Sequence, residues 1–588
     1  MEKSLEKKKR KIDPILVIGV LLFFILSSIL PFWQRQQGFV KFFSPDENAN
    51  YVFSKLYSEN RELSIFEKYN LVAQDLIHPR SYVSWQGVMK PVSFLGIILI
   101  YGQMARFLGS GLIPFLSPLF ASIALIFYYL IIKKVFNNIG IARKSFLFLA
   151  SFPVFIFYTS RSLFHNILFI SFFIIAVYFL IILLEKRPVK SGSFLLRNLK
   201  VEARLEYWKK LWGFDFLYSA LVGIFIGLSI GVRASELVWI FPAGLLLLIL
   251  RYRQLSFFRL GVMISFAFLA LMPVFYYNQV LHGSLFFGGY YEMNQSIENL
   301  GQASGNIIKS VFSGSWQELG SYFESIFKTI FYFGFHPRQS WQMFLAYVPK
   351  MFYWLIIPAI GGGLYLFVKR RDFLKKNWSF IIAYLLLSLI LVLYYGSWRF
   401  VDNPDPSRQT IGNSYTRYWL PIYLGIIPLA AVFCNYLTSF FKKRSIRVLS
   451  SLILSLSIIM PSLFFVYQGS EEGLKHYFPN LIEAREELKF ITESTETSAV
   501  IITEYHDKFF FPERKVIVGR FDDNNMLNYY YQIAKYLPLY YYNFTLSSAD
   551  LEYLNNRRLK EFGLNIDLKS EYNSVFSLYQ LRVLDEGN

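Results

Sequence analysis

The apolar runs of this chain are the feature that most constrains its fold. Mostly apolar stretches near the length of a membrane span recur along its 588 residues, and a helix of about 20 residues crosses the hydrocarbon core of a bilayer. Charged residues make up only 17% of the chain, against about 25% in globular proteins. Because backbone polar groups in lipid must bond within their own segment, the sequence predicts a polytopic α-helical membrane protein.

Basic residues lie mainly in short segments between these runs. Cytoplasmic loops are rich in Lys and Arg, so we expect these segments and the N-terminus on the cytoplasmic side of the plasma membrane. The net charge of +20 then follows from membrane topology and does not indicate nucleic-acid binding. The segments are 2–11, 133–144, 186–210, 251–259, 369–376 and 442–447.

The direction of the predicted spans follows from these basic segments. The run 92–108 is apolar but short, and if it crossed the bilayer every later basic segment would face outward. We therefore expect it to be a juxtamembrane or re-entrant helix on the outer side. The first run lacks a small-residue cleavage site and is predicted to remain a span. About eleven spans are expected, at 15–33, 112–132, 145–160, 166–184, 214–232, 235–250, 257–277, 347–368, 377–395, 417–439 and 447–468.

Three outer regions are then predicted to be large. The first is 34–111, and the second is 279–346, with an amphipathic helix over 316–333 that suits a membrane interface. The third is the tail, where helical patterns (near 479–494 and 547–562) alternate with strand patterns (499–503, 516–518 and 575–584). We expect two domains, a transmembrane module over 1–468 and a small extracytoplasmic α/β domain over 469–588.

Cysteine usage excludes two kinds of site. Cys434 is the single cysteine and lies inside an apolar run, so a disulfide framework and a zinc-cysteine site are both excluded.

The first candidate for chemistry is Ser44-Pro45-Asp46-Glu47, just after the first span. Adjacent carboxylates outside a membrane segment can take part in proton transfer or metal binding. Taken alone, the stretch is more typical of an ordinary helix start. In that interpretation Asp46 caps a helix beginning near Glu47, and both acids are solvated.

Other polar side chains reach the same outer face on this topology. They suit an anionic lipid headgroup or a phosphate, although Arg, Lys and Tyr also serve as plain interfacial anchors. They are His78, Lys90, Arg161, His165, Asn166, Arg233, Glu236, Tyr290, Tyr291, Arg417 and Tyr418.

The order of these features resembles the GT-C glycosyltransferases, in the branch of protein O-mannosyltransferases and lipid A aminoarabinose transferases. Asp46-Glu47 is similar to the family's Asp-Glu motif, and Lys90-Pro91-Val92 is similar to its Lys/His-Pro-Pro-Leu motif. Three later stretches also resemble family motifs: Ser160-Arg161-(x4)-Asn166, Asn278-(x3)-His282-Gly283-Ser284 with Gly289-Tyr290, and Arg417-Tyr418-Trp419-Leu420-Pro421.

The resemblance covers roughly residues 12–470 and leaves the tail uncovered. Asn166 stands where the family has a second acid, and Val92 stands where it has a second proline. The first departure weakens a two-carboxylate or metal-bridging site, although His165 could substitute as a ligand.

The resemblance implies a membrane glycosyltransferase with a polyprenyl-phosphate sugar donor. Transfer would invert the anomeric centre and reach an acceptor hydroxyl of a protein, lipid or glycan on the extracytoplasmic side. Asp46 would be the base, with Glu47 supporting it or binding a divalent metal ion. The leaving phosphate needs cations, which the resemblance assigns to Lys90, Arg161 and Arg417. The substrate cavity would be lined by His78, His165, Asn166 and Tyr290.

The alternative is a membrane transporter or lipid flippase without transferase activity. Such a protein needs ionisable residues or broken helices near the bilayer midplane. The predicted spans hold few internal charges, which argues against an ion-coupled carrier. A non-enzymatic scaffold is a further possibility, in which Asp46 would be replaceable.

Overall fold

The structure, a computed structural model, describes residues 13–186, 211–313, 316–403, 405, 408–469 and 472–584. Among them, eight helices are long and apolar enough to cross a membrane, or ten if each of two bent helix pairs forms one span. The predicted spans correspond to these, except that 235–250 falls in the shorter apolar segment Ala234–Leu250. The predicted class of polytopic helical membrane protein is confirmed. The basic segment 2–11 and all but Lys186 of 186–210 lie outside the described residues.

The described residues divide into two compact units, and neither is continuous in sequence. We call Met1–Ile29, Phe115–Met272 and Asn299–Leu474 the helical unit. We call Leu30–Pro114, Pro273–Glu298 and Lys475–Asn588 the mixed unit. This division differs from the predicted domains, because the first outer region packs with the tail.

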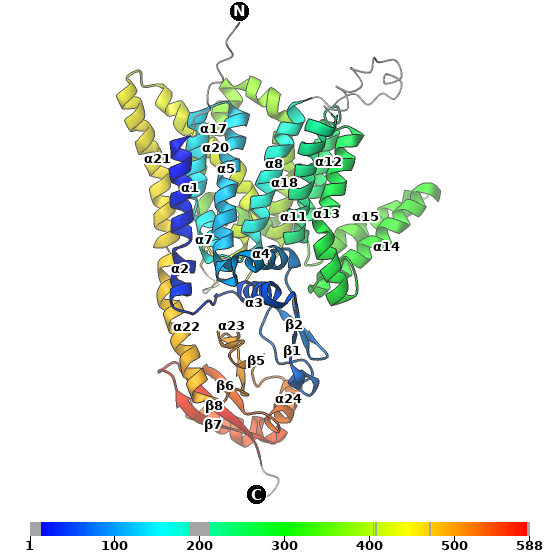
Figure 1. The fold of residues 1–588 in the computed structure, drawn as a ribbon, viewed down its shortest axis with the longest axis vertical. Helices are drawn as coiled ribbons and strands as arrows, with labels where there is room; N and C mark the ends of the chain where they lie inside the picture. The colour runs from blue at the N-terminus through cyan, green and yellow to red at the C-terminus, as the bar shows by residue number, and fades with distance from the viewer. Residues whose placement is uncertain are drawn as a thin grey trace, which may run out of the picture. The chain divides into compact units, whose positions relative to one another are not determined.

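The helical unit holds most of the long apolar helices. Within it α11 packs against α8, α5 against α8, and α17 against α20 (Figure 1). Its helices are α1 (Pro14–Ser27), α5 (Leu116–Phe136), α6 (Ile139–Ala150), α7 (Pro153–Arg161), α8 (His165–Glu185), α11 (Phe216–Val232), α12 (Leu237–Leu250), α15 (Trp316–Ile330), α16 (Pro337–Leu345), α17 (Tyr353–Lys369), α18 (Arg371–Ser397), α19 (Ser414–Tyr418), α20 (Leu420–Ser439) and α21 (Arg444–Tyr467). Two more, α13 (Phe257–His282) and α14 (Tyr291–Ser313), belong partly to each unit.

Two predicted spans are broken helices. The helices α6 and α7 meet at an angle of 51°, because Pro153 begins α7 and Phe152 before it takes the extended conformation that a residue preceding proline prefers. The segments Pro337–Lys350 and Tyr353–Lys369 meet at 94°, after a π-helical turn that contains Pro349. Such turns are a common cause of sharp bends.

The mixed unit combines a three-stranded and a five-stranded sheet with several helices. Its elements are α2 (Ile29–Gln36), α3 (Pro45–Asn60), β1 (Ile65–Phe66), β2 (Tyr82–Trp85), β3 (Val88–Pro91), α4 (Leu95–Leu108), α22 (Leu474–Ser494), β4 (Val500–Thr503), α23 (Asp507–Phe510), β5 (Lys515–Val518), α24 (Asn524–Ala534), β6 (Leu539–Phe544), α25 (Ser548–Tyr553), β7 (Leu564–Glu571) and β8 (Phe576–Val583). The small sheet has the order β1-β3-β2 and the large one β5-β4-β6-β8-β7. In the large sheet β4 is parallel to β5 and β6, while β8 is antiparallel to β6 and β7.

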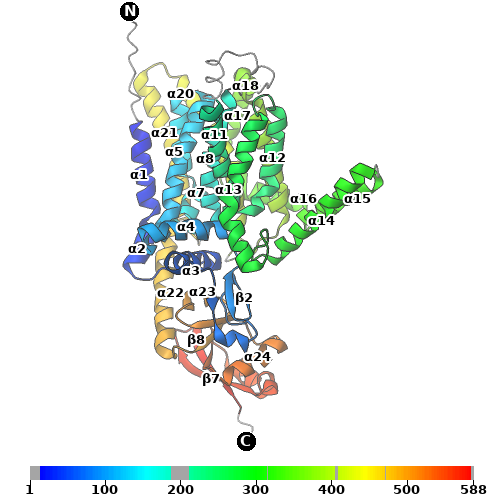
Figure 2. The ribbon, with the colours of Figure 1, turned by 45° about the vertical axis from the view of Figure 1, so that its right-hand side comes forward.

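The large sheet packs the tail together with the first outer region. Successive β4 residues point to opposite faces, so Ile502 packs in one buried cluster and Ile501 in another. Ala73 and Ile77 of the first outer region belong to the first cluster, and Phe39 belongs to the second. The sheet is therefore covered on both faces by residues that lie more than 400 positions earlier. Figure 2 shows its strands β7 and β8 with α24 beside them.

The helix α4 is shorter than a span. Its 14 residues reach about 21 Å at 1.5 Å per residue, against about 30 Å of hydrocarbon. It lies side by side with α3 in both ribbon views (Figures 1 and 2). The close approach depends on Gly102, where a Cβ atom would stand 2.8 Å from the Ser54 carbonyl oxygen of α3.

Candidate functional site

The acids Asp46 and Glu47 lie in the first turn of α3. Ser44 is the N-cap, Pro45 occupies the first helical position, and the Ser44 backbone N–H donates to Glu47 Oε2 at 3.2 Å. This is a capping box. The interpretation that Asp46 caps the helix is therefore wrong, and so is the expectation that both acids are solvated, because Glu47 is 1% exposed.

Asp46 is half-buried and joins α3 to the small sheet. The Ser81 hydroxyl donates to Asp46 Oδ1 at 2.5 Å. One turn further along α3, Asn50 accepts a hydrogen bond of 2.7 Å from the Ser93 hydroxyl, just before α4. Residues at i and i+4 share a helix face, so the face of α3 that carries Asp46 is turned toward both neighbours. Ser81 was not among the predicted site residues, since its sequence context carries no signal for such a contact.

Lys90 lies in β3 and contacts the end of α13. Its ammonium donates to the Leu281 carbonyl oxygen at 2.6 Å, an interaction typical of cations near helix C-termini. The Lys90-Pro91-Val92 motif packs closely on the Gly289-Tyr290 stretch. A Cβ atom on Gly289 would stand 2.6 Å from the Val92 carbonyl oxygen. The next residue, Tyr290, has its ring 5.4 Å from that of Phe94. Two motifs about 200 residues apart are thus adjacent in the mixed unit.

His78 lies at the edge of the large sheet. It forms an isolated parallel bridge with Ile517 of β5, and its Nδ1 is 2.9 Å from the Pro79 carbonyl oxygen. A structural role at the edge of the sheet accounts for this position. Within the part of the chain that the structure describes, no hydrogen bond joins His78 to Asp46.

In the helical unit the predicted arginines meet on one aromatic ring. The guanidinium carbons of Arg161 and Arg417 lie 4.8 Å and 4.9 Å from the ring centre of Phe164. Arg161 ends α7, whereas Arg417 comes from α19, more than 250 residues later. Cations over an aromatic face are attracted by its quadrupole, which is how two like charges share this position.

Arg233 joins this group of arginines through the ring of Tyr418, which Arg417 also approaches. Its guanidinium carbon lies 4.1 Å from the Tyr418 ring centre, and it forms an ion pair of 2.6 Å with Glu236. Tyr395 also donates to Glu236, at 2.8 Å. Three arginine side chains thus lie around the rings of Phe164 and Tyr418.

His165 and Asn166 begin α8, after a tight turn. Ser162 and Leu163 have φ angles of 66° and 52°, a region that residues other than glycine seldom adopt. His165 and Asn166 are buried, at 7% and 5% exposed. Since Asn166 cannot supply a carboxylate, this turn presents one cation, Arg161, and no acid.

Asp46 and Glu47 are the predicted ligands of a divalent metal ion. Among the described residues, no three His, Cys, Asp or Glu side chains gather where they could hold a metal ion. Both candidate carboxylates accept hydrogen bonds from serine, Asp46 from a hydroxyl and Glu47 from a backbone N–H. A divalent ion held by Asp46 and Glu47 would take its other ligands from water or substrate phosphate, as Mg²⁺ commonly does.

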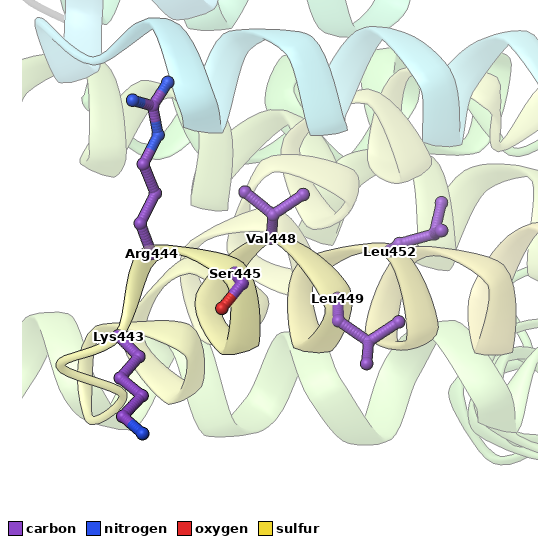
Figure 3. A pocket seen from close by; sticks show the side chains of 6 residues that line it. All are labelled: Lys443, Arg444, Ser445, Val448, Leu449 and Leu452. Carbon is purple, nitrogen blue, oxygen red and sulfur yellow. The ribbon is translucent and has the colours of Figure 1, made fainter.

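The helical unit has a hollow near the start of α21. Figure 3 shows its lining side chains, which come from the first turns of α21 and the residue before it. Val448, Leu449 and Leu452 are more than half exposed there, as expected for the lipid-facing side of a span. The hollow contains none of the predicted site residues.

No protein-family model and no curated protein matches this chain. It is similar to two solved structures of ArnT from Cupriavidus metallidurans. The structure bound to undecaprenyl phosphate is 10% identical at a TM-score of 0.46, and the apo structure is 11% identical at a TM-score of 0.38. Each match covers 96% of this chain and 97% of the other. Both TM-scores are low, and we rest the proposal below on the residues of this chain alone.

Proposed function

We propose that this protein is a membrane glycosyltransferase of the GT-C type, which moves a sugar from a polyprenyl-phosphate donor to an acceptor hydroxyl. The observation that carries the proposal is the group of Arg161, Arg417 and Arg233 around two aromatic rings, at one end of a bundle of apolar helices. An arginine group beside lipid-facing helices suits a ligand that is both anionic and apolar, because guanidinium groups bind phosphate oxygens in pairs.

In the proposed reaction the acceptor oxygen forms a bond to the anomeric carbon of the sugar. The bond from that carbon to the phosphate oxygen breaks, and the polyprenyl phosphate leaves with the electron pair. Attack from the opposite face inverts the anomeric centre. The acceptor proton passes to Asp46, whose Oδ1 accepts a hydrogen bond from the Ser81 hydroxyl. A positioned carboxylate is a suitable base for such a step.

The leaving phosphate gains negative charge as the bond breaks. Arg161 and Arg417 are proposed to stabilise that charge, as preorganised donors do in other transfer reactions. Lys90 is proposed as a further cation for the donor, although its ammonium is bonded to the Leu281 carbonyl oxygen. His165, Asn166 and Tyr290 are proposed to line the substrate cavity.

Glu47 is proposed to support Asp46 through the helix itself. Its bond to the Ser44 backbone fixes the start of α3, and capping residues are worth about 0.5–2 kcal/mol of helix stability. The divalent ion stays a proposal that chelation can test. Transfer that survives treatment with EDTA would exclude it.

A transporter or flippase is the second candidate, and one buried ion pair bears on it. Arg259 and Asp215 pair at 2.7 Å, and both are almost fully buried at the starts of α13 and α11. However, Arg259 also donates to three backbone carbonyl oxygens at helix ends. So many fixed contacts suit a structural pair better than a charge that must change partners during transport.

The test is a transfer assay with purified protein in lipid nanodiscs. Polyprenyl-phosphate sugars carrying a labelled sugar are supplied as donors, and released polyprenyl phosphate is measured against time. Comparison of envelope glycans and glycoproteins by mass spectrometry, with and without the gene, identifies the acceptor. Release from at least one donor supports the proposal. Movement of donor across the bilayer without release would favour the flippase.

A further inference from the structure

A chain of contacts leads from the tail of the mixed unit to Asp46. It begins at Asp507, a fully buried carboxylate at the start of α23. Asp507 accepts three hydrogen bonds from one residue, Arg80. The Arg80 backbone N–H bonds to Oδ2 at 2.8 Å, while its Nη2 and Nε bond to Oδ1 at 2.6 Å and 3.1 Å. A buried charge held this completely is costly to disturb.

Ser81, the next residue, is fixed on three sides. Arg80 holds it through the chain, the Val92 N–H donates to its carbonyl oxygen at 3.1 Å, and its own hydroxyl donates to Asp46. Its φ angle is 66°, in the left-handed region that favours glycine. A residue with a side chain persists there only where its surroundings impose that conformation. The contacts of Arg80 with the tail are part of these surroundings.

The same tail segment also contacts the residues that come just before α3. Lys41 is 7% exposed, and its ammonium donates to the Phe511 carbonyl oxygen at 2.5 Å and to Glu513 at 2.6 Å. Three residues further on, Ser44 caps α3. The stretch 507–513 of the tail therefore holds the chain both before Asp46 and beside its hydrogen-bond partner.

We propose that the α/β tail is a positioning element for Asp46, acting through Asp507, Arg80 and Ser81. The inference rests on the proposed function and adds to it a task for the part of the chain that the family resemblance leaves uncovered. A base must lie within hydrogen-bond reach of the proton it removes. A displacement of 1 Å costs about 100-fold in rate. Ser81 is thus a positioning residue, as are Arg80 and Asp507.

Ser81→Gly is the sharpest test, because glycine accepts the left-handed conformation and lacks the hydroxyl. If Ser81 matters only for folding, relief of the strained φ angle should leave the protein as stable or more so, with unchanged turnover. We expect an unchanged or higher melting temperature together with a fall in kcat of about 10- to 100-fold. The KM for the donor should stay the same.

Asp507→Asn tests the far end of the chain of contacts. We expect kcat to fall by a similar factor, and hydrogen–deuterium exchange to rise in residues 41–48 and 80–85 of the full-length protein. The double variant with Ser81→Gly should be no slower than the worse single variant, since both changes act on one path. Arg520→Gln is the matched control, because it breaks another ion pair of the tail, with Glu504, that is not on this path.

The outcomes separate the inference from the proposed function. No release of polyprenyl phosphate by the wild-type protein overturns the proposed function. Near wild-type transfer by Asp46→Asn overturns the assignment of the base, on which the inference rests. An inactive Asp46→Asn enzyme with full kcat in Ser81→Gly overturns only the positioning role of Ser81. Full kcat and unchanged exchange in Asp507→Asn overturn the role of the tail. Equal losses in Arg520→Gln and Asp507→Asn also overturn it, because the effect would then be general to the tail.

Discussion

At the scale of residues, hydrogen bonds distinguish two neighbouring acids. Glu47 is buried and bonded to the backbone of the N-cap, which is a structural task. Asp46 is half-buried and accepts a hydrogen bond from Ser81, a side chain from a distant part of the chain. The local sequence cannot separate them, because both acids favour the first turn of a helix. The contact with Ser81 makes Asp46 the better candidate for the base.

Asp46→Asn should abolish transfer and leave the fold intact. The amide oxygen can still accept the Ser81 hydrogen bond, but it cannot take a proton from the acceptor. General base catalysis contributes about 10²–10⁴-fold, and we expect a loss of kcat in that range in the transfer assay. Glu59→Gln, an exposed acid at the other end of α3, is the control and should be silent. A near wild-type rate in Asp46→Asn would reject the assignment.

Arg161→Gln and Arg417→Gln should each weaken use of the donor. Charge-assisted hydrogen bonds are worth about 1.5–3 kcal/mol, so we expect kcat/KM for the donor to fall about 10- to 100-fold in each. Because both guanidinium groups contact Phe164, the double variant should lose less than the product of the two effects.

Arg251→Gln is the control for the arginine variants. Arg251 also lies over a phenyl ring, that of Phe380, and is bonded to a serine hydroxyl of the helical unit. It is not part of the group around Tyr418. Losses of equal size in all three variants would show that the arginines only stabilise the bundle.

At the scale of elements, close packing brings together motifs that are distant in sequence. The residues after β3 lie against the segment before α14 at Gly289, with no room for a side chain. This contact sets the position of Tyr290 relative to Phe94. The two motifs of the family resemblance are therefore neighbours for a physical reason, the absence of a Cβ atom at one position.

Gly289→Ala should disturb this contact, whereas Gly288→Ala should not. A methyl group at Gly289 would stand 2.6 Å from the Val92 carbonyl oxygen, and one at Gly288 would meet nothing within 4 Å. We expect Gly289→Ala to cost about 1–3 kcal/mol, visible as a lower melting temperature, together with slower transfer. Equal behaviour of the two variants would mean that the backbone here shifts at no cost.

At the scale of the whole molecule, a shared core determines which parts of the chain lie on one side of a membrane. Residues 30–114 and the tail bury side chains in the same clusters of the mixed unit. A bilayer cannot separate segments that share a core, so these two lie on the same side. The basic segments predict that this side is extracytoplasmic.

Cysteine labelling tests this topology. In a Cys434→Ser background, Asn60→Cys and Lys569→Cys place single thiols at exposed positions of α3 and β7. We expect an impermeant maleimide to label both in intact cells, because both should face outward. Labelling of neither before permeabilisation would reverse the predicted orientation. Labelling of only one would contradict the shared core of the mixed unit.

The sequence by itself determined the membrane class, most of the spans and several strands of the tail, because each depends on local hydrophobic pattern and length. It missed β6, whose residues from Leu539 to Asn543 are all buried. A strand covered on both faces does not alternate. It also located Asp46, Arg161 and Arg417 as candidates, from their places beside predicted spans.

The tertiary structure alone decided which residues meet. Arg161 and Arg417 both contact the ring of Phe164 although more than 250 residues separate them. Asp46 accepts a hydrogen bond from Ser81, which lies in another part of the first outer region. It also joined the tail to the first outer region through Asp507 and Arg80. Such contacts follow from how buried faces pack, and no local pattern records them, because packing depends on the shape of surfaces that are far apart in the chain.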